Sequence, residues 1–148
     1  MTLYISIIFL VFVFDFLTKA MIRSNLSLGA EIHLLPIFSL VHVRNTGVAF
    51  GFFQGRNTFF LVLGLVVILV LMVWGYRCLK TDKRLALILA LVIGGAAGNL
   101  LDRALFGNVT DFLDFYIGSY HWPAFNVADS AIFVGAAFLF WASFKREN

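Results

Sequence analysis

The sequence predicts an all-α membrane protein with four transmembrane helices and a small extramembrane β-sheet in the loop between the first two helices. Hydrophobic residues make up 61% of the chain and charged residues 13%, whereas soluble domains average about 45–50% and about 25%. The mean hydropathy of +0.95 agrees with this class. A length of 148 residues fits a single domain, 1–148. Four apolar stretches are long enough to cross a hydrocarbon core of about 30 Å, namely 2–22, 58–76, 85–101 and 127–144.

The first apolar stretch is expected to be a retained transmembrane helix and not a cleaved signal peptide. A signal peptide needs a basic segment before its apolar core, and here only Met1 and Thr2 precede the run. Asp15 and Lys19 are four residues apart, so they share a helix face and can pair. Two interpretations of this pair stay open: it makes burial tolerable near the helix end, or it belongs to an active site.

The first outer loop, 24–57, is too apolar for a flexible linker. Alternating and β-branched residues in 31–43, interrupted by Pro36, predict a short sheet resting on the membrane surface. The tripeptide Asn-Thr-Gly at 45–47 then signals a turn. Asn45 is either a turn residue that satisfies its own backbone or an amide that reaches toward a substrate.

The stretch 58–76 carries no charge, and the strongest positive cluster of the chain follows it, within 77–84. Basic residues favour the cytoplasmic side of a membrane, so this loop and both termini are predicted to be cytoplasmic. The cluster also accounts for the net charge of +3, and we expect no nucleic-acid partner. In the third stretch, Gly94 and Gly98 form a GxxxG pattern that favours close helix packing.

The segment 107–131 holds three of the eight acidic residues and lies between the last two apolar runs. An extended piece, 108–110, is predicted directly before Asp111. Asp129 lies just inside the last span, where a charge is less unfavourable than the roughly 2.5–3.5 kcal/mol at a helix centre. An ionisable group in such a place indicates a functional site. The aromatic residues in 112–122 are expected to form a loop that covers this site.

The predicted topology brings the polar groups of the spans to one depth, near the outer interface. Random placement would scatter them over both faces of the membrane, so this convergence is a stronger signal than any single residue. Asn99 and Arg103 share a helix face because they are four residues apart. The polar set consists of Asp15, Lys19, Asn99, Asp102, Arg103, Asp111, Asn126 and Asp129.

Two carboxylates held close together cannot both ionise readily, so one keeps its proton while the other is charged. Such a pair can hydrolyse a peptide without a metal, because the carboxylate takes a proton from water and the acid polarises the scissile carbonyl. Asp111 and Asp129 are the predicted pair. Asp114 is the main rival of Asp111. Asp102 is more simply interpreted as a charge partner of the adjacent Arg103.

Other chemistries have weaker support in the sequence. A serine–lysine hydrolase needs Lys19 beside Ser24 or Ser130, and no spacing demands it. The three histidines lack metal-ligand spacing. The single Cys78 excludes a disulfide framework and a thiolate metal site. We therefore expect no metal and no cofactor.

Five pieces of the sequence resemble, in order, the motifs of the lipoprotein signal peptidase family (signal peptidase II), the bacterial membrane aspartyl proteases. The pieces are DFLTK at 15–19, RNTGVAFG at 44–51, GGAAGNLLDR at 94–103, VTDF at 109–112 and FNVADS at 125–130. The resemblance implies that Asp111 and Asp129 are the catalytic aspartates, which decides against Asp114. It further implies substrate-binding or site-supporting roles for Asn45, Asn99, Arg103, Asn126, Asp15 and Lys19. In the family the loop after the first helix forms a small extramembrane sheet, which the resemblance places over 31–53.

The resemblance also implies a reaction and its setting. The substrate is a prolipoprotein whose lipobox cysteine carries a diacylglyceryl group, and the enzyme cuts just before that cysteine. The enzyme is a multi-pass protein of the bacterial cytoplasmic (inner) membrane, in contact with membrane lipid, and its active site lies near the outer, periplasmic face. The family uses no cofactor and is inhibited by globomycin-type cyclic peptides, and a monomer is enough for the chemistry. One departure is that no basic residues precede the first span.

Two other classes of function are alternatives. A small transporter or channel component would use the same carboxylates as a proton relay. A relay spreads ionisable groups across the membrane depth, whereas 58–76 has none. The second alternative is a non-catalytic assembly subunit that is held together by small-residue helix faces. This role would not explain why the ionisable Asp129 lies inside the last span.

Overall fold

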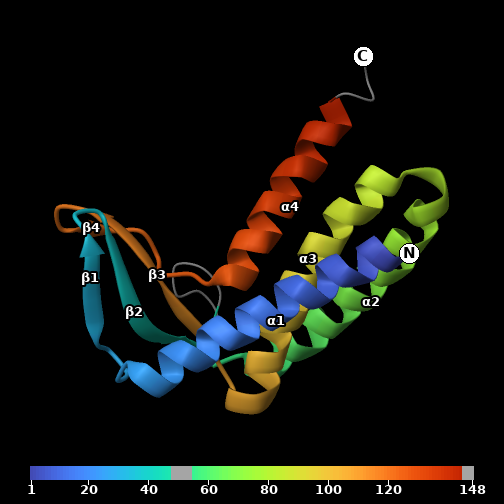
Figure 1. Ribbon diagram of the computed structural model, residues 1–148. Helices are drawn as coiled ribbons and strands as arrows, with labels where there is room; N and C mark the ends of the chain where they lie inside the picture. Colours follow the sequence, from blue (N-terminus) through green and yellow to red (C-terminus); the bar gives the residue numbers. More distant parts are fainter. Residues whose placement is uncertain (48–54, 145–148) are drawn as a thin grey trace.

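The computed structural model describes residues 1–47 and 55–144, which form four long helices and a four-stranded antiparallel sheet (Figure 1). In these residues, all four helices are long and apolar enough to cross a membrane, as the sequence predicted, and the chain is a multi-pass membrane protein. The elements are α1 (Thr2–Asn25), β1 (Glu31–Leu35), β2 (Phe38–Asn45), α2 (Asn57–Thr81), α3 (Lys83–Phe106), β3 (Val109–Ile117), β4 (Tyr120–His121) and α4 (Val127–Phe144).

The central helix is α3, which packs against each of the other three helices. The other helices expose most of their apolar side chains on the outside, as expected where lipid is the solvent. The buried side of α3 supplies the larger part of the core. This core consists of Tyr4, Ile68, Cys78, Ala86, Leu89, Ala90 and Ile93.

Glycines in α3 allow the neighbouring backbones to come close. A side chain at Gly94 would collide with Val11 of α1. A side chain at Gly95 would collide with the backbone of Ala128 at the start of α4. The close packing that the sequence predicted for the GxxxG pattern is therefore observed. Gly95, which lies between the two ends of the pattern, allows α4 to approach as well.

The cytoplasmic loop predicted over 77–84 is almost entirely helical. Helix α2 runs to Thr81 and α3 starts at Lys83, so Asp82 alone separates them. The Asp82 side chain accepts a hydrogen bond from the backbone N–H of Leu85 at 3.0 Å, which is an N-cap contact. Both helices extend beyond the apolar spans because the flanking lysines and arginines are good helix formers.

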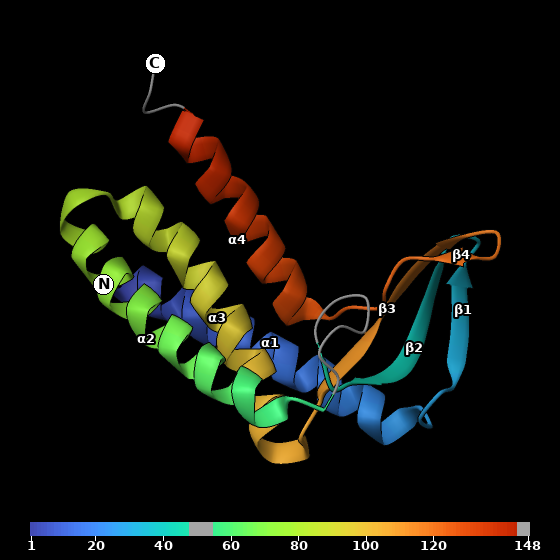
Figure 2. The same ribbon diagram turned by 180° about the vertical axis from the view of Figure 1, so that it is seen from behind.

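The sheet lies at the end of the helices where α1 ends and α4 begins (Figures 1 and 2). The predicted sheet over 31–53 is confirmed in β1 and β2, but the sheet is not confined to that loop. Its strand order is β1-β2-β3-β4, so the segment between α3 and α4 supplies the other half. An isolated two-stranded hairpin is only marginally stable in water. Pairing of β2 with β3 stabilises the β1–β2 hairpin by adding further strands. Residues 48–53 of the prediction lie outside the described residues.

The pairing of β2 with β3 fixes the surroundings of one carboxylate. Val43 is the partner of Asp111, and Asn45 is the partner of Val109. Side chains two residues apart lie on the same face of a strand, so Asn45 and Asp111 face the same side of the sheet. Two segments between helices that are distant in sequence are thereby brought together next to the start of α4.

Candidate active site

Asp111 lies in β3 and is only 2% exposed. Two side-chain amides donate to its carboxylate. The Nδ2 atom of Asn45 lies 3.0 Å from Oδ2, and the Nδ2 atom of Asn126 lies 2.7 Å from Oδ1. Because a buried carboxylate is unfavourable without hydrogen-bond donors, these two amides are what make its position tolerable.

Asn45 is the turn residue that the sequence offered as one alternative, and its side-chain nitrogen reaches a carboxylate of the cavity. Its side-chain oxygen accepts a hydrogen bond from the backbone N–H of Gly47 at 3.0 Å, which is the turn that the Asn-Thr-Gly tripeptide predicted. Its side-chain nitrogen is then directed at Asp111. The turn therefore fixes which end of the amide faces the carboxylate.

The start of α4 is a capping box built from Asn126 and Asp129. The Oδ1 atom of Asn126 accepts from the backbone N–H of Asp129 at 2.9 Å, and the Oδ2 atom of Asp129 accepts from the backbone N–H of Asn126 at 3.2 Å. This reciprocal pair satisfies two donors that a helix N-terminus leaves free. The orientation of the Asp129 carboxylate is thus set by the way in which the helix begins.

Asn126 also joins the two carboxylates. Its backbone N–H donates to Asp129, while its side-chain nitrogen donates to Asp111. Asn126 itself is fully buried. One residue therefore determines how the carboxylate on a strand is placed relative to the carboxylate on a helix.

Asn99 of α3 connects Asp129 to a buried cation. Its Nδ2 atom donates to Asp129 Oδ1 at 2.7 Å, and its Oδ1 atom accepts from Lys19 Nζ at 2.8 Å. The Lys19 ammonium also contacts Asp15 at 2.8 Å, and both side chains are fully buried. The predicted pairing of Asp15 with Lys19 is observed, and the pair is one residue removed from Asp129.

Asp15 contributes to the start of α4 as well. Its Oδ1 atom accepts a hydrogen bond from the backbone N–H of Ala128 at 2.8 Å. A side chain at Gly98 would occupy the space of the Asp15 carboxylate. The glycine therefore makes room for the aspartate, and the aspartate ties α1 to α4.

The predicted pairing of Asp102 with its neighbour Arg103 is wrong. Asp102 instead accepts from Arg23 at 3.0 Å and from the backbone N–H of Thr110 at 2.9 Å. Adjacent residues on a helix point in different directions, so Asp102 faces α1 while Arg103 faces the other side. Arg23 was not among the predicted site residues, although it lies four residues after Lys19 on the same face of α1.

Arg103 is held near the C-terminal end of α3 by two contacts. Its Nη2 atom donates to the carbonyl oxygen of Gly47, and its guanidinium lies over the ring of Phe60 with 4.9 Å to the centroid. Among the described residues, the buried Nη1 atom of Arg103 has no hydrogen-bond partner. A cation is therefore available close to the two carboxylates.

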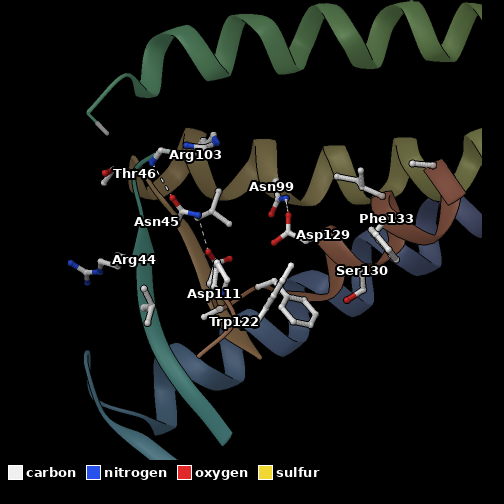
Figure 3. A pocket seen from close by; sticks show the side chains of 18 of the residues that line it. Arg44, Asn45, Thr46, Asn99, Arg103, Asp111, Trp122, Asp129, Ser130 and Phe133 are labelled. Atoms are coloured by element: carbon white, nitrogen blue, oxygen red, sulfur yellow. Dashed lines mark hydrogen bonds between the residues drawn. The ribbon is translucent and has the colours of Figure 1, made fainter. Parts of the chain in front are cut away.

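A cavity of about 1100 Å³ brings these residues together (Figure 3). Asp111, Asp129, Asn45, Asn99 and Arg103 line it, as does the segment 122–125. The figure shows Asp111 and Asp129 reaching it from different elements, β3 and α4. Apolar side chains of α4 continue the lining, among them Ile132, Phe133 and Val134.

Burial, followed by the negative charge of Asp129, raises the pKa of Asp111 to about 7. The hydrogen bonds from Asn45 and Asn126 act in the opposite direction, as does the positive charge of Lys19. Like charges held near each other in a poorly solvated site favour a shared proton. The cavity therefore contains a carboxyl group able to hold a proton near neutral pH.

The rival residues lie elsewhere or are engaged otherwise. Asp114 does not line the cavity, and its Oδ2 atom is 2.8 Å from His121 Nδ1. The hydroxyl of Ser24 donates to Met21, and that of Ser130 donates to the carbonyl of Asn126, so neither is bonded to Lys19. In the part of the chain that the structure describes, no three metal-ligating side chains gather.

The residues 112–122 are not the covering loop that was expected. They belong mostly to β3 and β4, and Phe112 is buried in the sheet. Of this aromatic set, only Trp122 lines the cavity. The β-branched and aromatic residues concentrated in 109–117 were the available signal for a strand.

The fold and the cavity together define a multi-pass membrane protein with two carboxylates facing a cavity at one end of its helices, an arrangement suited to hydrolysis. The profile of the signal peptidase (SPase) II family matches residues 7–145. A lipoprotein signal peptidase of Alteromonas mediterranea is 41% identical over 143 residues, which is 94% of this chain and 79% of the relative. One of Desulforapulum autotrophicum is 45% identical over 140 residues, which is 89% and 86% of the two chains.

Two solved structures, each described as a bacterial membrane enzyme determined by the in meso method, have the same fold. The first superposes with a TM-score of 0.88 at 31% identity, over 98% of this chain and 89% of the other. The second has a TM-score of 0.84 at 32% identity, over 96% and 92%. The chain belongs to the signal peptidase II family, and it is accordingly a signal peptidase, a protease.

Proposed function

We propose that this protein is an aspartyl endopeptidase that removes the signal peptide from diacylglyceryl-modified prolipoproteins, with Asp111 and Asp129 as its catalytic residues. The observation that carries the proposal is that the two carboxylates line one cavity and are joined through a single buried residue, Asn126. The names of the relatives, lipoprotein signal peptidases, support the substrate class.

The reaction needs one ionised and one protonated carboxyl group. We assign the proton to Asp111, because the pKa of this residue is about 7. Asp129 lies in the first turn of α4, where the helix dipole favours a negative charge. The Asp129 carboxylate takes a proton from water, and the resulting hydroxide attacks the scissile carbonyl carbon while Asp111 donates its proton to the carbonyl oxygen.

The tetrahedral product of this attack then collapses. The carbon–nitrogen bond breaks, the amine leaves with the proton that Asp129 received, and a proton from the intermediate returns to Asp111. The signal peptide is released with a new carboxyl end, and the lipidated cysteine becomes the amino end of the mature protein. Water is the sole co-reactant, so no metal or cofactor enters a step.

Neighbouring side chains hold the carboxyl groups and the substrate. Asn45 orients Asp111, and Asn99 orients Asp129. Arg103 is assigned to a substrate carbonyl or to the developing negative charge, since its Nη1 atom has no partner among the described residues. Lys19 and Asp15 support the site from the side of α1.

The cavity fits a substrate that combines a peptide with lipid chains. It is polar at the two aspartates and apolar along α4, where Ile132 and Phe133 line it. Both the signal-peptide helix and the acyl chains arrive from within the bilayer, so the scissile bond lies near the interface, where water is available. Globomycin-type cyclic peptides are expected to occupy the same cavity.

The proposed setting is the bacterial cytoplasmic membrane, with both termini in the cytoplasm and the cavity near the periplasmic face. The basic cluster between α2 and α3 supports this orientation. The sheet lies at the opposite end of the helices from that cluster (Figure 2), and residues of β2 and β3 line the cavity. All proposed catalytic residues come from one chain, so a monomer is sufficient.

The test is a gel-shift cleavage assay with purified protein in detergent. The substrates are one prolipoprotein with and without its diacylglyceryl group, and the variants are Asp111→Asn and Asp129→Asn. Glu31→Gln, at a residue of β1 outside the cavity, is the matched control for loss of a carboxylate. We expect that only the lipidated substrate is shortened, that Glu31→Gln cuts normally, and that both aspartate variants still bind substrate without cutting it.

Cleavage by either aspartate variant would overturn the assignment of the catalytic pair. Asp102 or Asp114 would then be the next candidate for a catalytic aspartate. If the native protein never cuts a lipidated substrate, a proton relay or an assembly role becomes the better account. A flux assay in proton-loaded vesicles then separates those two alternatives.

A further inference from the structure

One wall of the cavity is the short segment 122–125, called the cavity wall below. All four of its residues line the cavity, and it leads directly into Asn126, which contacts both carboxylates. Figure 3 labels Trp122, one of these four residues, among the side chains that line the cavity. The position of this segment therefore affects the shape of the cavity at the point where the reaction is proposed to occur.

The end of the cavity wall next to Asn126 is fixed by backbone hydrogen bonds. The N–H of Phe125 donates to the carbonyl of Leu113 at 3.1 Å, and the Phe125 carbonyl accepts from Phe112 and Leu113 at 2.9 and 2.8 Å. The ring of Phe125 also stacks on Phe115, with 5.9 Å between centroids. This end of the cavity wall is therefore hydrogen-bonded to the sheet, although it lies outside the four named strands.

The other end of the cavity wall is held by the short backbone pairing of β4 with β3 and by side-chain contacts. Strand β4 has only two residues, Tyr120 and His121, and the backbone N–H of Trp122 adds one hydrogen bond, to Phe115 at 2.8 Å. His121 Nδ1 lies 2.8 Å from the carboxylate of Asp114. The ring of His121 stacks on Tyr116 with 4.9 Å between centroids.

Asp114 is poorly placed for any purpose other than this contact. It is 5% exposed, and a buried carboxylate left without a partner is strongly unfavourable. Its partner His121 has a side chain that is 47% exposed, so the exposed residue is held by the buried one. Between the two ends of the wall, Pro123 has no N–H with which to add a backbone hydrogen bond.

We propose that Asp114 and His121 are positioning residues, whose side-chain contact fixes the cavity wall and thereby the width of the substrate cavity above Asp111 and Asp129. Asp114 and His121 touch neither Asp111 and Asp129 nor the substrate. They act through Trp122, which follows His121 in the chain. The enzymatic consequence rests on the proposed function, whereas the structural consequence does not. Loss of the contact widens the range of positions of Trp122 and weakens substrate binding more than it slows chemistry.

The structural test follows the fluorescence of Trp122 in a protein where Trp74 and Trp141 are replaced by phenylalanine. The variants are His121→Ala, which removes the contact, and His121→Asn, whose side-chain nitrogen takes the place of Nδ1. His33→Ala is the matched control, because His33 is also a histidine of the sheet and contacts Ser39 and Tyr116 instead of the cavity wall. Acrylamide quenching of Trp122 is expected to rise about twofold in His121→Ala, as for a locally loosened segment, and to return toward the parent value in His121→Asn.

The enzymatic test measures kcat and KM for the lipidated prolipoprotein with the same variants. We expect His121→Ala to raise KM by about fivefold with kcat within about twofold, the pattern of a lost binding contribution. His121→Asn is expected to restore KM, and His33→Ala to leave it unchanged. A merely destabilised protein would lose active fraction and therefore kcat, and His121→Asn, which does not restore the stacking on Tyr116, would not rescue it.

The outcomes are separable from those of the proposed function. Unchanged quenching of Trp122 in His121→Ala overturns the inference whether or not the protein cleaves anything. Increased quenching with an unchanged KM in an active enzyme also overturns it, because the wall then has no influence on the substrate. If no variant, including the parent, cleaves substrate, the proposed function has failed, and the fluorescence result alone decides whether the contact fixes the wall.

Discussion

The carboxylate of Asp15 on α1 fills the space that a side chain at Gly98 of α3 would occupy. From this position Asp15 accepts a hydrogen bond from the backbone N–H of Ala128 and forms an ion pair with Lys19. A glycine in the middle of α3 thus determines where a buried carboxylate lies, and this carboxylate in turn holds the start of the helix that bears Asp129.

Replacement of Gly98 by alanine is expected to destabilise the protein and to reduce cleavage. The added methyl group collides with Asp15, and overpacking of this kind costs about 1–3 kcal/mol. Gly64→Ala is the control, because its methyl group meets only the flexible end of Leu100. Thermal unfolding in detergent should show a lower Tm for Gly98→Ala alone, and equal Tm values for the two variants would contradict the packing account.

Replacement of Asn126 separates helix capping from the placement of Asp111. Serine is as good an N-cap residue as asparagine, so Asn126→Ser keeps the cap of α4 but removes the amide that donates to Asp111. We expect Asn126→Ser to retain a Tm close to that of the parent and to lose about 100-fold in kcat, as when one oriented hydrogen bond at a reacting group is removed. Asn126→Ala should lose the cap in addition, at about 0.5–2 kcal/mol.

Thermal unfolding and steady-state kinetics on the two Asn126 variants provide the check. Parallel losses of Tm and kcat in both would mean that the residue acts only through stability. A fully active Asn126→Ser would mean that Asp111 is oriented by Asn45 alone.

The raised pKa of Asp111 predicts how activity depends on pH. The proposed reaction requires the protonated form of this residue, and its pKa is about 7. As pH rises through this value, kcat/KM is expected to fall by about tenfold per pH unit, because kcat/KM reports the free enzyme. A profile that stays flat to pH 9 would contradict the assignment of the proton to Asp111.

The same pKa predicts how stability depends on pH. The folded-state pKa of about 7 is above the ordinary value of 3.8, so the folded protein holds the proton more tightly than the unfolded chain. The contribution of Asp111 to stability is therefore fully present below about pH 4 and is lost as pH rises to about 7, at roughly 1.4 kcal/mol per pH unit. Asp111→Asn should abolish this slope and be more stable than the parent above pH 7, as measured by Tm at a series of pH values.

Removal of the buried cation at Lys19 is expected to destabilise the protein strongly. Lys19→Met leaves Asp15 as a buried charge without its partner, and breaking a buried pair costs about 3–5 kcal/mol. The double variant Lys19→Met with Asp15→Asn should recover a large part of the loss, because no unpaired charge remains. Additive effects in a double-mutant cycle, measured by Tm or denaturant unfolding, would mean that the two residues do not depend on each other.

The spans and the depth of the polar residues follow from local properties. The four helices arise from uninterrupted apolar stretches, and the i,i+4 spacing of Asp15 and Lys19 is sufficient to predict that they pair. Lipid exposure imposes this regularity, because a spanning backbone must satisfy its own hydrogen bonds. Such features depend on residues close together in sequence.

The partners of Asp102 and the extent of the sheet were not predictable in this way. Asp102 is adjacent to Arg103 in sequence, yet it bonds to Arg23, which is 79 residues away. The strands β2 and β3 likewise come from different loops. Both depend on how α1, α3 and the sheet pack against one another, and local patterns carry no information about that packing.

The sequence by itself determined the membrane class, the four spans and the residue types that gather near one interface, because hydropathy and helical periodicity are local quantities. Only the tertiary structure decided that Asn126 joins Asp111 to Asp129, that Gly98 accommodates Asp15, and that His121 contacts Asp114 next to the cavity wall. These contacts depend on how the helices and strands pack against one another. Their geometry depends on distances of a few ångströms between backbones, which the order of residues does not express.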